Sequence, residues 1–111
     1  MEKVLKQHEV NYFLSEIEST FPNFVAGIVC DCDGFPIASK VPKNFHIHEN
    51  QMALSAIAGN REFIDDPRLM KVKRDLDHNK NVKLLILLDK QSSYISRFKA
   101  LNAIIEKQNL F

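Results

Sequence analysis

Two cysteines, two aspartates and a glycine lie within residues 30–34, and side chains of these types can bind a metal or attack a substrate. Thiolates and imidazoles bind zinc, and His46 and His48 follow in the next stretch of chain. A strong zinc pattern has two spaced cysteine pairs, whereas this chain has a single C-x-C. We therefore expect no metal site, with Cys30 buried as a small apolar side chain and Cys32 in a turn.

Three other kinds of reactive site can be tested against the same residues. A calcium-binding EF-hand needs a carboxylate at its twelfth position, yet the mainly apolar residues 35–37 follow the Asp-x-Asp-Gly stretch at once. The chain has three glycines and no phosphate-binding motif, which disfavours a nucleotide site. A nucleophilic Cys32 needs a base that the sequence does not place beside it. We expect no cofactor and no enzymatic activity, and a thiol enzyme that uses Cys32 is kept as an alternative.

Composition limits the class of protein further. A chain of 111 residues with 45% apolar and 26% charged side chains is typical of an ordinary globular protein, and we treat residues 1–111 as a single domain. The formal net charge of +1 disfavours a nucleic-acid partner. The longest apolar run, residues 84–88, is too short to span a bilayer, and the first residues lack the apolar core of a signal peptide. We expect a cytoplasmic protein without membrane insertion.

Apolar spacing predicts the elements that must position these side chains. Residues 3–20, 48–64 and 94–105 show the periodicity of amphipathic helices, the third with Ser92 or Ser93 as its N-cap. The stretches 24–30 and 82–88 are apolar on both faces, as central strands are.

Two further stretches predict strands at the edges of the sheet. Residues 35–39 contain Pro36, which cannot donate to a ladder, so this strand should be an edge or carry a bulge. Residues 69–76 alternate between two faces, one of them charged, which is typical of a strand with one face in solvent. Asp31, Asp33 and Gly34 supply turn chemistry between the first two strands.

The element order is therefore α-β-β-α-β-β-α. It predicts an α/β protein of the α+β type, in which a single, mainly antiparallel sheet of four or five strands is sandwiched by helices. We place the first and third helices on one face of the sheet and the middle helix on the other.

The segment FPNFVAGIVCDCDGFPIASK resembles the first strand, Asp-x-Asp-Gly turn and second strand of the Roadblock family, named for a dynein light chain. The helix NQMALSAIAG is also similar to the alanine-spaced helix of that family, and the element order extends the resemblance over residues 3–105. One feature departs from the family. Its members usually have three strands between the second and third helices, whereas residues 68–90 have room for two, so a strand is lost or a short one is hidden at residues 75–81.

The resemblance implies a Roadblock/profilin-like fold and a non-enzymatic module. Such modules form homodimers, or pair with a second Roadblock-like subunit, through the middle helix and often an edge strand. Relatives serve as scaffolds or regulators of small Ras-like GTPases, as adaptors on dynein, and as GTPase activators in bacterial polarity systems. We therefore expect a scaffold or regulatory module that binds a small Ras-like GTPase or a related assembly partner.

The expected dimer or partner surface lies on the middle helix and the edge strand that follows it. Small side chains such as Ala53 and Ala56 allow close approach of another helix, and an edge strand can be covered by a symmetric partner. The residues expected at this surface are Met52, Ala53, Ala56, Ile57, Asn60, Met70, Val72, Arg74 and Leu76. An alternative of another class is a small-ligand sensor of profilin/PAS-like architecture, which would keep an internal apolar cavity.

Overall fold

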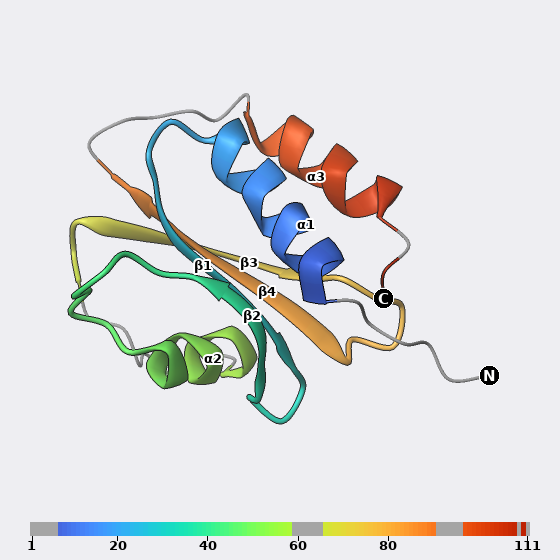
Figure 1. Cartoon of the computed structure of the whole chain (residues 1–111), viewed down its shortest axis with the longest axis horizontal. Helices are drawn as coiled ribbons and strands as arrows, with labels where there is room; N and C mark the ends of the chain where they lie inside the picture. Colours follow the sequence, from blue (N-terminus) through green and yellow to red (C-terminus); the bar gives the residue numbers. More distant parts are fainter. Residues whose placement is uncertain (1–6, 59–65, 91–96, 109, 111) are drawn as a thin grey trace.

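The computed structural model describes residues 7–58, 66–90, 97–108 and 110, and these residues contain three helices and four strands. In chain order they are α1 (Gln7–Thr20), β1 (Phe24–Asp31), β2 (Pro36–Lys40), α2 (Glu49–Ile57), β3 (Leu69–Asp75), β4 (Val82–Asp89) and α3 (Arg97–Lys107) (Figure 1). The predicted order α-β-β-α-β-β-α and the α+β class are confirmed.

The strands form one antiparallel sheet in the order β2-β1-β4-β3. The two strands predicted as central, β1 and β4, lie side by side in the middle, and β2 and β3 are the edges. The pairing of β1 with β2 shifts register between Val29 and Cys30, opposite Pro36, so β2 is both an edge and the partner in a bulge. Residues 76–81 form a turn, and the described sheet therefore has four strands and no hidden fifth one there.

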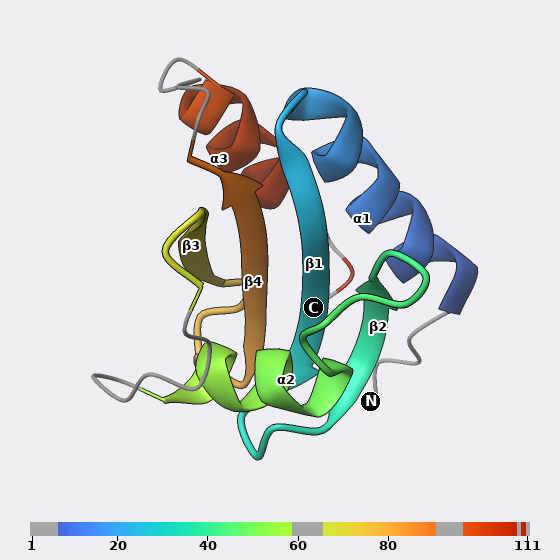
Figure 2. The same ribbon diagram turned by 90° about the vertical axis from the view of Figure 1, so that its left-hand side faces the viewer.

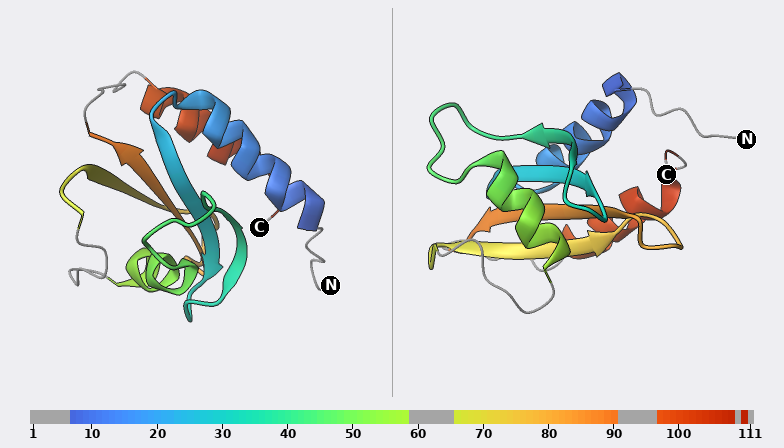
Figure 3. Two further views of the ribbon diagram at one scale, coloured as in Figure 1. Left: turned by 60° about the vertical axis from the view of Figure 1, so that its left-hand side comes forward. Right: turned by 90° about the horizontal axis from the view of Figure 1, so that it is seen from below.

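Helices cover both faces of the sheet, and the predicted placement is correct. α1 and α3 lie together on one face, and α2 alone lies on the other (Figures 1 and 3). Alternate side chains of β4 divide between two cores, because successive residues of a strand point to opposite faces. Leu84 and Ile86 join α1 and α3, whereas Leu85 joins the core beneath α2.

The hairpin between β1 and β2 has the turn chemistry that the sequence predicts. One carboxylate oxygen of Asp31 accepts hydrogen bonds from the backbone N–H groups of Asp33 and Phe35, both at 2.9 Å. Gly34 has φ 87°, in the left-handed region that side chains with a Cβ rarely adopt. A Cβ at this position would also lie 3.1 Å from Cδ1 of Ile57, so the hairpin tip packs closely on α2.

α2 is shorter than the sequence predicts. The helix ends at Ile57, and Ala58 already has an extended backbone with φ −84° and ψ 108°. The carbonyl of Ala58 instead accepts a hydrogen bond from Nζ of Lys73 at 3.1 Å, which ties this end of α2 to β3. Three predicted features lie outside the described residues. These are the continuation of the middle helix through residues 59–64, the start of the first helix at residues 3–6 and the serine N-cap of the third helix. Among the described residues, no helix is long and apolar enough to cross a membrane.

We predict that Leu101→Ala lowers the free energy of unfolding by about 2–5 kcal/mol. Leu101 is the one fully buried side chain that α3 contributes to the core with α1, and its removal leaves a cavity. Urea unfolding measures the loss, and Asn102→Ala, an exposed neighbour on the same helix, is the control expected within about 0.5 kcal/mol of wild type. Equal stability of the two variants would show that α3 does not pack as described.

Candidate partner-binding surface

The two cysteines occupy different environments. Cys30 is fully buried, and its Sγ lies 3.8 Å from the carbonyl oxygen of Ala53. Burial, with a smaller contribution from the negative charge of Asp31, raises the pKa of the Cys30 thiol to about 11. A raised pKa keeps the thiol protonated, which is the opposite of what a nucleophile needs. Cys32 is exposed in the hairpin, so the predicted burial of Cys30 and turn position of Cys32 are confirmed.

Each histidine of the His46-x-His48 pair is used by the fold. Nδ1 of His48 accepts a hydrogen bond from the backbone N–H of Asn50 at 3.2 Å, and the backbone N–H of His48 donates to Oε1 of Gln51 at 3.0 Å. This reciprocal arrangement is a capping box at the start of α2. His46 bonds through Nε2 to a carboxylate oxygen of Asp66 at 2.8 Å. Within the described ranges, no group of three or more His, Cys, Asp or Glu side chains is placed to hold a metal ion.

The Asp66 side chain connects the segment that follows α2 in the sequence to the loop that precedes it. This side chain is 8% exposed and accepts hydrogen bonds from Nε and Nη2 of Arg68, each at 3.1 Å, besides the contact with His46. The same carboxylate accepts from the backbone N–H of Arg68 at 3.0 Å. These bonds, those from Arg68 first, hold the pKa of Asp66 well below its usual range. The start of β3 is therefore anchored to the loop before α2.

Most of the side chains expected at the dimer surface lie in the protein's own core. Met52 and Ala53 are 0% exposed and Ala56 is 7% exposed, all three against the sheet. Small side chains allow close approach, but the helix uses them to approach its own sheet. Met70, Val72 and Leu76 point to the other face, where they pack with the core of α1 and α3.

The remaining expected residues are less enclosed. Ile57 is partly buried beside the core beneath α2, and half-buried Arg74 donates from Nη1 to the carbonyl of Lys73 at 2.8 Å. Asn60 lies outside the described residues. A contact between subunits stays a prediction. A partner could reach the outer side of α2 and the backbone of β3, but not the buried side chains of α2.

An exposed apolar side chain of α2 lies close to another on the hairpin between β1 and β2. Leu54 is 41% exposed, and Phe35, which follows Gly34 at the hairpin tip, is 67% exposed. A Cβ on Gly34 would lie within 4 Å of both Ile57 and Leu54, so hairpin and helix form one continuous surface. We call Phe35, Leu54 and Ile57 the Leu54 surface. Phe35 and Leu54 are not among the residues that the sequence predicts at the partner surface, although an aromatic residue beside a turn glycine is a visible signal.

The two edges of the sheet differ in what covers them. At β2, Pro36 has no N–H to offer, and the side-chain amide of Gln7 on α1 donates to the carbonyl of Ile37 at 3.0 Å. Within the described part of the chain, β3 pairs with β4 on one side and with no strand on the other.

The register shows which backbone groups of β3 point outward. Leu76 donates to the carbonyl of Val82 and Lys90 donates to that of Arg68, both at 2.9 Å. In an antiparallel pair, every second residue of a strand forms backbone hydrogen bonds to the neighbouring strand. The even-numbered residues of β3 therefore form the hydrogen bonds to β4. The backbone N–H groups of Lys73 and Asp75 therefore face the outer edge. Figure 2 shows α2 crossing the strands with its C-terminal end near this edge.

Comparison with known proteins adds no family assignment. No protein-family model matches the chain, and no curated protein or solved structure is similar enough to count as a match.

We predict that Asp66→Asn lowers stability near neutral pH and flattens its dependence on acid. The native state holds the pKa of Asp66 below the unfolded value of about 3.9, so this contribution is present above that pH. It is lost as the pH falls through the native pKa. Urea unfolding from neutral pH down through the acid range measures the effect, with Asp33→Asn in the exposed turn as the control. Parallel pH profiles of wild type and Asp66→Asn would contradict it.

Proposed function

We propose that this chain is a non-enzymatic scaffold or regulatory module that dimerises and presents its assembled surface to a small Ras-like GTPase or a related assembly partner. The second subunit is another copy or a second Roadblock-like chain. The observation that carries the proposal is the outer edge of β3, which offers backbone donors next to the C-terminal end of α2.

Edge pairing supplies the directional part of the interaction. A second β3 strand would continue the sheet and satisfy the outward backbone groups of Lys73 and Asp75, as in recognition by strand addition. Lys73 also carries a charge on this edge, and lysines on edge strands oppose indiscriminate pairing. Pairing therefore needs an additional contact that only the proper partner provides.

The Leu54 surface is suited to provide that contact. Leu54 and Phe35 are two of the most exposed large apolar side chains in the described chain, and burial of such a side chain stabilises an interface by about 1.5–3 kcal/mol when complete. Because Ala58 is bonded to Lys73, the helix and the strand edge are held in a fixed relation to each other. A partner that pairs with β3 would approach the same end of α2.

The GTPase part of the proposal is supported by the resemblance alone. The described element order α-β-β-α-β-β-α is the order over which the resemblance extends, but only two strands lie between α2 and α3 in the described residues, where Roadblock members usually have three. The alternative of a small-ligand sensor needs an internal apolar cavity. Side chains such as Ile28, Met52 and Leu85 fill the layer beneath α2, with 0% exposure each.

Substitution of Lys73 by proline tests the edge. The N–H of Lys73 points away from β4, so proline removes an outward donor and leaves the bonds to β4 in place. We expect wild type to sediment as a dimer at tens of micromolar and Lys73→Pro as a monomer. Lys73→Ala loses the bond to Ala58 but keeps the outward N–H, and it is the matched control expected to remain a dimer. Monomeric wild type, or dimeric Lys73→Pro, would contradict the proposal.

A charge in the Leu54 surface tests the second contact. Leu54→Glu should raise the dimer dissociation constant at least tenfold, about 1.4 kcal/mol, because a carboxylate would be buried in an apolar interface. Asn50→Glu places the same charge on an exposed position of α2 outside the Leu54 surface and should leave dimerisation unchanged. Equal effects of the two variants would count against an interface at Leu54.

Capture from lysate tests the partner class. Immobilised wild type should retain a small GTPase in a manner that depends on whether GDP or a non-hydrolysable GTP analogue is added, whereas Leu54→Glu should retain less. Capture that is identical with both nucleotides, or absent with a dimeric protein, would refute the GTPase part and leave dimerisation standing.

A further inference from the structure

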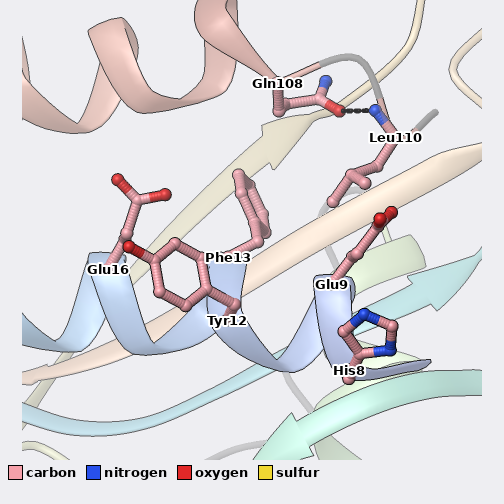
Figure 4. Close-up of a pocket in the computed structure, with 7 residues that line it drawn as sticks. All are labelled: His8, Glu9, Tyr12, Phe13, Glu16, Gln108 and Leu110. Carbon is pink, nitrogen blue, oxygen red and sulfur yellow. Dashed lines mark hydrogen bonds between the residues drawn. The ribbon is translucent and has the colours of Figure 1, made fainter. Parts of the chain in front are cut away.

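A hollow of about 400 Å³ lies along the outer side of α1, on the sheet face opposite α2 (Figure 4). Tyr12 and Phe13 come from α1 on one side of it, and Gln108 and Leu110 come from the chain after α3 on the other. The lining also includes His8, Glu9 and Glu16, so it combines apolar and polar side chains from two segments far apart in the sequence.

The wall opposite α1 is held by hydrogen bonds. The Gln108 side chain donates from Nε2 to the carbonyl of Leu76 in the turn between β3 and β4, at 2.9 Å. Its Oε1 accepts from the backbone N–H of Leu110, also at 2.9 Å. Both ends of this amide are therefore engaged, and its bond to the backbone of Leu110 links the rim of the hollow to the turn between β3 and β4.

The hollow has an apolar centre with a glutamate on each side, and His8 lies beside Glu9 at one end. Tyr12 is 69% exposed, more than any other large apolar side chain of the described residues. Glu9 and Glu16 also line the hollow, and their separation of seven positions corresponds to about 10 Å along the helix. Neither glutamate forms an ion pair within the described part of the chain, and α1 contains no lysine or arginine.

We propose that this hollow binds an amphipathic helix of a partner protein, with an apolar side chain seated on Tyr12 and basic residues seven positions apart facing Glu9 and Glu16. The hollow lies beside α1 and not at a sheet edge, so it offers no strand with which a bound segment could pair. A helix suits it because a helix satisfies its own backbone hydrogen bonds. Two turns of a helix packed nearly along α1 match the spacing of the two carboxylates. This site is independent of the proposed function, since it lies on the other face of the sheet from the Leu54 surface.

A library of helical peptides tests the proposal directly. Its members carry arginine at two positions seven apart and varied apolar residues between them, and fluorescence polarisation at low salt measures their binding to the full chain. We expect members that bind wild type, with affinity that falls as salt screens the charges. Tyr12→Ser and Glu16→Lys should each weaken binding about tenfold, as substitutions of interface anchors do.

Glu18→Lys is the matched control, because it makes the same charge change on α1 at a position that pairs with Lys40 outside the hollow. It should bind the peptides nearly as wild type does, and all three variants should unfold at the temperature of wild type. Three results would overturn the proposal. These are a library in which no peptide prefers wild type to Tyr12→Ser, equal losses in Glu16→Lys and Glu18→Lys, and a Tyr12→Ser variant that self-associates less without peptide, which would assign the hollow to a second copy.

Discussion

The pairing of β1 with β4 is the constraint on which the rest of the structure depends. Both strands are buried on both faces, so each contributes alternate side chains to two separate cores. Neither core can form without the other, because the same strands supply both. This arrangement requires helices on both faces, and it leaves β2 and β3 as the strands that must meet solvent or a partner.

The two edges meet that requirement in different ways. β2 carries a proline and is bonded to α1 through Gln7, which leaves it little capacity to accept another strand. β3 is tied to α2 through Lys73 and to the loop before α2 through Asp66, so it is well positioned, yet its outward backbone groups have no described strand beside them. A rigid strand with an open edge is what pairing between subunits needs.

The sequence was sufficient to predict the layers and their order. Residues 82–88 are apolar on both faces, which is required of a strand covered on both sides, and they form the central strand β4. The proline of β2 lacks a backbone donor, which restricts it to an edge strand or a bulge. Helical periodicity also identified the buried stripe of α2. It could not show what the stripe packs against, since Ala53 and Ala56 are equally suited to their own sheet and to another helix.

Contacts between distant segments were not predictable in the same way. His46 and Asp66 are 20 positions apart, and no local pattern relates them. The hollow beside Tyr12 depends on the place where α3 ends relative to α1, which the tertiary packing decides. The exposure of Leu54 and Phe35 follows from the same packing, because the hairpin tip closes on α2 through Gly34.

Hydrogen exchange of the β3 amides, followed by NMR at increasing protein concentration, tests the open edge most directly. We predict that the amides of Lys73 and Asp75 become protected as concentration rises, whereas the Arg74 amide, which bonds to β4, stays equally protected throughout. Exchange of Lys73 and Asp75 that does not change with concentration, in a chain that otherwise remains folded, would contradict pairing through this edge.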